Sequence, residues 1–253
     1  MVSGKLGAGG LEFSAQASCA RILERHRDTI EVRKDHVAIA NLVRIIEATL
    51  KLSNTKGFHA TSMRDLAKAS GISMGGLYSY VANKTALLSM ILGEVVETII
   101  EVLSFPPEEV LSDPRAHLRW IIETHIRVSE EMLPWFVFAF MEAKSFPAKE
   151  RAYAIQAEEA TEKIIADVLK HGMRTGVFAE REIGLTAALI KPLLQDWYVK
   201  RAKHRKRGTT VEQYVEAVMT LVEKAFVPGA MVEEGWERPA APARARARAE
   251  AKA

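Results

Sequence analysis

Apolar residues recur along most of the chain at the spacing of an α-helix. Between residues 39 and 50, five apolar positions follow the spacing i, i+3, i+4, i+7 and i+11, which places them on one helix face: Ile39, Leu42, Val43, Ile46 and Leu50. Similar patterns predict further helices over roughly 83–103, 113–130, 133–144, 149–171, 182–207 and 211–226. No alternating run of β-branched residues bounded by turns occurs. The pattern therefore predicts an all-α fold.

A hairpin of two short helices is predicted after the first helix. Ser62 can cap one helix with Asp65 at its third position, as in a capping box. Gly71 can supply the left-handed backbone that ends this helix, and Ser73 can cap a second helix running through Tyr80. Such hairpins occur as helix-turn-helix motifs, but many others serve only packing.

The residues around the second short helix suit contact with a nucleic-acid backbone. Gly75 and Gly76 would each cost about 1 kcal/mol relative to alanine in a helix, and bare backbone can lie close to a sugar-phosphate wall. Asn83 can cap the next helix, where Lys84 would hold an ammonium beside free N–H groups. Residues 37–92 carry six Lys or Arg and two Asp or Glu. This local excess of positive charge favours DNA as a partner.

One run of residues is more specific than the hairpin itself. It reads Leu77-Tyr78-x-Tyr80-Val81-x-Asn83-Lys84-x-x-Leu87-Leu88. Residues 37–92 thereby resemble the N-terminal DNA-binding domain of the TetR/AcrR regulators, in which a Tyr-Tyr/His-Phe-x-x-Lys-x-x-Leu pattern follows the recognition helix. Two departures are Val81, where Phe is commonest, and Met74-Gly75-Gly76, where Lys-Gly-Thr is frequent. The resemblance implies an N-terminal three-helix head that binds DNA and a C-terminal helical body that binds a small molecule and dimerises.

The candidate DNA contacts fall into two groups. Arg64 and the start of the recognition helix are expected at base edges, whereas other side chains of the head are expected on phosphates. Few of these side chains can hydrogen-bond to bases, so specificity should depend on Arg64, backbone proximity and DNA shape. The expected contacts are Ser62, Arg64, Ser73, Met74, Gly75, Gly76, Tyr78, Tyr80 and Lys84.

Aromatic residues and methionines are concentrated in the second half of the chain. The segment from Trp135 to Met141 is apolar on all sides, which predicts a helix buried in the centre of the body. Such residues either fill a core or line a pocket for an apolar ligand, and the resemblance favours the pocket because TetR/AcrR bodies bind small molecules. The candidate pocket residues are Trp120, Trp135, Phe136, Phe138, Phe140, Met141, Tyr153, Met173, Phe178 and Trp197.

The last two predicted helices carry more apolar residues than one buried face requires. In the TetR/AcrR family these helices pair with their copies as a four-helix bundle, so the resemblance implies a homodimer and a palindromic operator. The basic run 200–207 is either a solvated helix end or the neighbour of an acyl-CoA site, since it is loosely similar to TetR regulators of fatty-acid catabolism. The candidate interface residues are Leu189, Leu193, Val215, Val218 and Val222.

Composition, the helix pattern and what the resemblance implies together divide the chain into four segments. They are a flexible or partly helical extension over 1–36, the helix-turn-helix head over 37–84, the ligand-binding and dimerisation body over 85–227, and a disordered Ala/Arg-rich tail over 228–253. With 253 residues and 48% apolar content, the chain can form a small head and a larger body. The charged stretch 21–36 is either a solvated helix or an arm that could reach a minor groove.

Other classes of protein have little support in the sequence. The single cysteine, Cys19, lies in a polar leader and excludes an internal disulfide. Neither a membrane span nor a secretory signal is indicated, so a cytoplasmic protein is expected. Seven dispersed histidines accompany no catalytic motif, metal-binding motif or phosphate loop, so we expect no enzyme activity, metal or cofactor.

The sequence thus predicts a ligand-responsive regulator of transcription. The simplest form is a repressor that an apolar small molecule, such as a fatty acyl-CoA or an aromatic compound, releases from a palindromic operator. A helical adaptor without an effector and a transcriptional activator are the alternatives.

Overall fold

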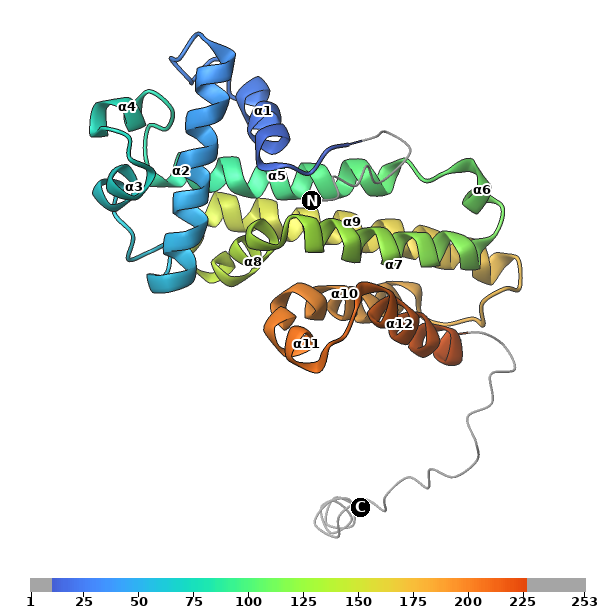
Figure 1. The fold of residues 1–253 in the computed structure, drawn as a ribbon. Helices are drawn as coiled ribbons and strands as arrows, with labels where there is room; N and C mark the ends of the chain where they lie inside the picture. Colours follow the sequence, from blue (N-terminus) through green and yellow to red (C-terminus); the bar gives the residue numbers. More distant parts are fainter. Residues whose placement is uncertain (1–10, 227–253) are drawn as a thin grey trace, which may run out of the picture.

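A computed structural model describes residues 11–226, and this part of the chain forms α-helices and one 3-10 turn without a strand (Figure 1). The all-α prediction is confirmed. The predicted tail over 228–253 lies outside the described residues. The elements are α1 Ala15–Arg25, α2 Asp35–Lys56, α3 Met63–Ser70, α4 Met74–Tyr78, α5 Lys84–Ser104, α6 Glu108–Leu111, α7 Pro114–Glu131, α8 Leu133–Met141, η1 Ala143–Ser145, α9 Ala148–Arg174, α10 Ile183–Val199, α11 Arg201–Arg207 and α12 Val211–Phe226.

The hairpin of α3 and α4 forms through the caps that the sequence predicts. Asp65 N donates to Ser62 Oγ at 3.1 Å while Ser62 N donates to the Asp65 carboxylate at 2.8 Å, which completes the capping box. Gly71 ends α3 with a left-handed φ of 67°, and Ser73 Oγ accepts from Gly76 N to cap α4. Helix α4 ends at residue 78, two residues before the predicted end.

The N-terminal segment differs from the prediction. Helix α1 packs on α2 and α5 and buries Cys19, which makes the predicted polar leader wrong. Burial raises the pKa of the Cys19 thiol to about 12. Arg21 Nη2 lies 2.6 Å from a carboxylate oxygen of Glu94, a fully buried residue of α5, and Arg25 pairs with the other oxygen. Because both guanidiniums hold Glu94, the interpretation of this segment as a solvated helix or minor-groove arm is corrected for α1.

The body is a layered bundle in which α5, α7 and α9 run side by side, with α10 and α12 packed along them (Figure 1). The predicted helix 182–207 breaks at Lys200 into α10 and α11, and Pro192 lies inside α10. Helix α9 continues past Gly172, where the sequence predicted an end. A Cβ on Gly172 would lie 2.0 Å from the Phe178 ring, so this glycine admits the aromatic side chain rather than ending the helix.

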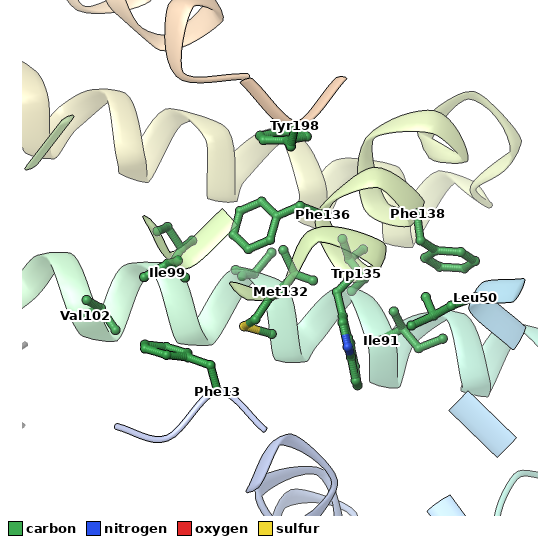
Figure 2. Close-up of a cluster of buried hydrophobic side chains, with 14 of the residues drawn as sticks. Phe13, Leu50, Ile91, Ile99, Val102, Met132, Trp135, Phe136, Phe138 and Tyr198 are labelled. Atoms are coloured by element: carbon green, nitrogen blue, oxygen red, sulfur yellow. The ribbon is translucent and has the colours of Figure 1, made fainter. Parts of the chain in front are cut away.

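Helix α8 is not buried on all sides, contrary to the prediction. Phe140 and Met141 are 42% and 63% exposed, whereas three aromatic residues of the same helix are buried. Figure 2 shows Phe136 directed toward Tyr198 of α10 and Phe138 directed toward Leu50 of α2. This short helix therefore lies between the body and the head and contacts both.

Candidate functional site

The exposed surface of α3 and α4 holds most of the predicted DNA contacts. Arg64, Ser73, Gly75 and Tyr78 are exposed, while Met74 and Gly76 are half-buried. The hydroxyl of Ser62 is also exposed, but it already donates to Asp65 Oδ2 at 2.7 Å. The hydrogen bond from Lys56, together with those from Ser62, holds the pKa of the Asp65 carboxyl well below its usual range. The exposed face of α3 and α4 is therefore largely polar, and the capping box of Ser62 and Asp65 holds the start of α3.

The two glycines of α4 are required for different reasons. A Cβ on Gly76 would lie 3.1 Å from both Ile72 Cγ2 and Ser73 Oγ, so the packing of the turn favours glycine there. A Cβ on Gly75 would meet nothing within 4 Å. No contact in the described chain therefore explains Gly75, and its bare backbone remains available to a surface outside the protein.

Tyr80 does not lie on this face. Its side chain is 3% exposed, and its hydroxyl accepts a hydrogen bond from Asn41 Nδ2 at 2.8 Å. The prediction of a phosphate contact is therefore corrected: Tyr80 fixes the end of α4 against α2. The neighbouring Tyr78, at 49% exposure, remains accessible.

Lys84 is also placed differently from the prediction. Its Nζ donates to the backbone carbonyls of Phe58, His59 and Thr61 at 2.6, 2.8 and 2.9 Å. The same ammonium lies 4.7 Å from the centre of the Phe58 ring. An ammonium has three N–H donors, and all three are used here. Lys84 therefore ties the start of α5 to the loop before α3, instead of offering a free donor to a phosphate.

The body contains a mainly apolar cavity between α5, α7, α8, α9 and α10. Its volume is about 140 Å³, and it opens to solvent. This is smaller than the roughly 300–1,000 Å³ typical of sites for drug-sized molecules, so the cavity suits a small ligand. The lining residues are Leu92, Val95, Val96, Ile99, His125, Phe136, Ala139, Phe140, Ala143, Ala154, Ala157, Glu158, Thr161, Lys191, Gln195 and Tyr198.

Only Phe136 and Phe140 of the ten predicted pocket residues line this cavity. Trp197 is wholly buried in the core, where its Nε1 donates to Glu130. The other predicted residues pack elsewhere or face solvent, so the aromatic content was a poor guide to the cavity. These residues are Trp120, Trp135, Phe138, Met141, Tyr153, Met173 and Phe178.

Two polar residues of the cavity wall were missed by the sequence reasoning. Lys191 of α10 is 6% exposed and His125 of α7 is 1% exposed, and their Nζ and Nε2 atoms lie 3.1 Å apart. Burial is the main cause that lowers the pKa of Lys191 to about 8 and the pKa of His125 well below its usual range. In the sequence, the one sign of this polar pair was that Lys191 is a single lysine inside the apolar stretch 183–194.

Two family models match separate parts of the chain. Residues 45–91 match the family model of bacterial regulatory proteins of the tetR family, and residues 111–222 match that of the tetracyclin repressor-like C-terminal domain. The chain belongs to the TetR family. Its relatives are transcriptional regulators.

Two of these relatives are similar over different parts of the chain. HbdR of Aromatoleum sp. (strain CIB) is 23% identical over 181 residues, which cover 71% of this chain and 78% of HbdR. BetI of Yersinia pestis is 33% identical over 105 residues, which cover 37% of this chain and half of BetI.

Solved structures share the fold. PfmR from Thermus thermophilus superposes with a TM-score of 0.59 at 26% identity, covering 77% of this chain and all of PfmR. FadR from Bacillus halodurans, titled a fatty acid degradation regulator, superposes with a TM-score of 0.57 at 17% identity over 71% of this chain and 92% of FadR. Within residues 11–226 no helix has the length and apolar content to cross a membrane.

The predicted interface residues of this TetR-family chain lie in two different environments. Val215, Val218 and Val222 are 2–3% exposed within the single chain, because this face of α12 packs against α7. Their assignment to a dimer interface is therefore corrected. Leu189 of α10 is 60% exposed and Leu193 is half-buried.

Two further leucines that the prediction omitted are exposed, one on α10 and one on α12. Leu185 is 61% exposed and Leu221 is 59% exposed. Leu185 and Leu189 are four residues apart and so share one face of α10. We call Leu185 and Leu189 the leucine patch.

Helix α8 connects the cavity to the head of this TetR-family protein. The cavity is lined by Phe136 and Phe140 of α8, and the residue that follows the helix, Glu142, is buried. The Glu142 carboxylate accepts from Ser53 Oγ at 2.5 Å and from Phe58 N at 2.9 Å, both in the head. Phe58 is also the residue whose ring and carbonyl contact the Lys84 ammonium. One continuous set of contacts therefore joins the cavity wall to the loop before α3.

Proposed function

We propose that the protein is a homodimeric repressor that binds a palindromic operator through α3 and α4 and leaves it when an apolar small molecule occupies the cavity. The observation that carries the proposal is the contact of α8 with both the cavity and the head. A ligand can shift the protein between two states only through its different affinity for them. Because α8 forms part of the cavity wall and also contacts the head, the affinity of the cavity for a ligand can depend on the position of the head.

Two helices support the coupling between ligand and DNA. Helix α5 contributes Leu92, Val95, Val96 and Ile99 to the cavity wall, and its first residue holds the loop before α3. Helix α8 contributes Phe136 and Phe140 to the wall, and Glu142 at its end holds Phe58. A ligand that displaces α8 relative to α5 would therefore change the orientation of the recognition hairpin.

DNA binding through the predicted face can be tested by fluorescence anisotropy with DNA from upstream of the protein's own gene. Arg64→Ala should lose roughly 1–3 kcal/mol of discrimination at one base position. Arg174→Ala, which removes an exposed arginine at the end of α9, is the matched control and should bind like the wild type. Equal affinity of wild type and Arg64→Ala for every sequence would contradict the assignment of Arg64.

The homodimer is supported by the leucine patch, since large exposed apolar groups in a cluster mark interaction surfaces. Sedimentation velocity at micromolar concentration should give a dimer for the wild type and a monomer for Leu189→Glu. Ile155→Glu is the control, because Ile155 is an exposed apolar residue on a different helix, α9. A wild-type monomer would contradict the dimer and the palindromic operator together.

The effector is proposed to be apolar because most of the cavity wall is apolar. The acyl-CoA form of the proposal rests on α11, where Lys203, Arg205, Lys206 and Arg207 are exposed while Arg201 and His204 pair with Glu130 and Asp196 within the chain. Decanoyl-CoA and decanol, each titrated into the protein–DNA complex, distinguish an acyl-CoA effector from an uncharged apolar effector. Release by decanoyl-CoA alone favours a thioester ligand, and release by neither compound rejects both forms.

A further inference from the structure

Lys191 is a buried cation with an incomplete set of partners. Within the described residues its only hydrogen bond runs to His125 Nε2, and no carboxylate oxygen lies within 4.0 Å of its Nζ. A lysine ammonium carries three donors, so two of them have no protein partner. A buried charge without an opposite charge is unfavourable, and structural lysines are seldom placed in this way.

The groups that face Lys191 from neighbouring helices do not neutralise it. Glu158 and Glu162 of α9 act on it only from a longer distance, and the Glu158 carboxylate accepts from Gln195 Nε2 at 2.8 Å. From α7 the neighbour is His125, whose low pKa keeps the imidazole neutral. The remaining titratable group of the wall, Tyr198, has a pKa raised by burial and is also neutral. Within the described residues, Lys191 therefore has no direct ion pair, and only the more distant carboxylates of Glu158 and Glu162 oppose its charge.

His125 adds a second unsatisfied atom at the same place. Its Nδ1 is buried and has no hydrogen-bond partner in the described part of the chain. Because Lys191 donates to Nε2, the neutral ring carries its proton on Nδ1, which makes this atom a donor. Two side chains that line the cavity from different helices thus carry unpaired N–H groups, and a negatively charged acceptor would pair with the ammonium of Lys191.

We propose that Lys191 and His125 form the binding site for the carboxylate of an effector whose hydrocarbon part fills the cavity. This inference rests on the proposed function and narrows the effector to a carboxylic acid with an aliphatic or aromatic body. The carboxylate would accept charge-assisted hydrogen bonds from the Lys191 ammonium and would supply the direct ion-pair partner that the described residues do not provide. An alcohol supplies no charge, and an amine is repelled.

Isothermal titration at pH 7 with decanoate, decanol and decylamine tests the proposal, because the three probes share one chain and differ in the head group. Decanoate should bind at least tenfold more tightly than decanol, and decylamine should bind more weakly than both. In Lys191→Met, the preference for decanoate over decanol should be lost. Lys170→Met, which changes an exposed lysine of α9, should keep the wild-type order.

Equal affinities of the wild type for decanoate and decanol would overturn the carboxylate site, as would a preference for decanoate that survives in Lys191→Met. The wild-type comparison decides the question even if the variant does not fold. The same probes added to the protein–DNA complex test the proposed function separately. Release of DNA by decanol with no preference for decanoate would reject the carboxylate site alone, whereas no release by any probe would reject the ligand-responsive repressor.

Discussion

The head and the body each hold a lysine ammonium against other protein atoms, but they do so in opposite ways. Lys84 in the head donates to three backbone carbonyls and lies over the Phe58 ring. Lys191 in the body has one imidazole nitrogen as its partner and no carboxylate within ion-pair distance in the described chain. The first lysine has no donor left, whereas the second has two.

This difference separates a structural cation from a candidate binding site. Lys84 had the motif of a phosphate contact in the sequence, yet its donors are used to hold the loop before α3. Lys191 had no motif, yet its donors face a cavity. A candidate ligand-binding group is therefore identified by its unpaired donors and not by its being a basic residue.

Among the substitutions that test this comparison, Lys84→Met should have the largest effect on stability. It removes three charge-assisted hydrogen bonds, and the free energy of unfolding should fall by about 3 kcal/mol, since each such bond contributes roughly 1.5–3 kcal/mol and the three are not additive. Urea denaturation measures the loss. If the lysine instead held a phosphate, the variant would keep its stability and the salt slope of DNA binding would fall by about one unit.

Glu142→Ala should follow in size, because it leaves Phe58 N and Ser53 Oγ without their acceptor at the junction of α8 and the head. An unpaired buried donor costs about 1–3 kcal/mol, so stability should fall by about 2 kcal/mol. Ligand affinity should persist while the ligand loses its effect on DNA affinity. Glu150→Ala, which removes the acceptor of Ser89 Oγ between α9 and α5, is the matched control. If the ligand released the Glu142→Ala variant from DNA as it releases the wild type, the contact between Glu142 and the head would not transmit the effect of the ligand.

Lys191 should make stability depend on pH in a definite direction. Burial lowers its folded pKa to about 8, below the unfolded value of about 10.4. Between these values the unfolded chain binds more protons, so the stability of the wild type rises with pH over this window. From pH 7 to 10 the wild type should gain about 2 kcal/mol relative to Lys191→Met. A difference between the two proteins that does not change with pH would show that Lys191 is not a buried cation.

Gly75→Ala should have the smallest effect on the fold. Its Cβ would meet nothing within 4 Å, so the substitution should stabilise the free protein by roughly 0.5–1 kcal/mol through helix propensity. DNA affinity should nevertheless fall, because the added methyl group would lie where the backbone is proposed to approach DNA. Thermal unfolding and anisotropy with the same preparation measure both effects. Unchanged DNA affinity would remove Gly75 from the interface.

The head was largely predictable because its structure is set by neighbours in sequence. The cap at Ser62 depends on Asp65, and the caps at Ser73 and Asn83 each depend on a backbone N–H three residues later. The left-handed turn at Gly71 depends on glycine itself. Such local rules can be read directly from the order of residues.

The cavity was not predictable by the same means, because its polar pair comes from residues 66 positions apart. Amphipathic spacing correctly indicated that Val215 and Val218 are buried, but it could not show that they pack on α7 of the same chain. Aromatic content likewise indicated burial without location, so Trp197 was assigned to a pocket although it lies in the core. In each case the sequence indicated that a residue is buried but not which element it packs against.

The most direct test of the account is an NMR titration of the Lys191 side-chain amine, with and without decanoate. The account predicts a pKa of about 8 in the free protein and a clear rise when decanoate binds, because the carboxylate stabilises the charged form. The assignment of the resonance comes from its loss in Lys191→Met. A pKa near the ordinary lysine value of about 10.4 that decanoate leaves unchanged would contradict the claim that Lys191 is a buried cation awaiting an anion.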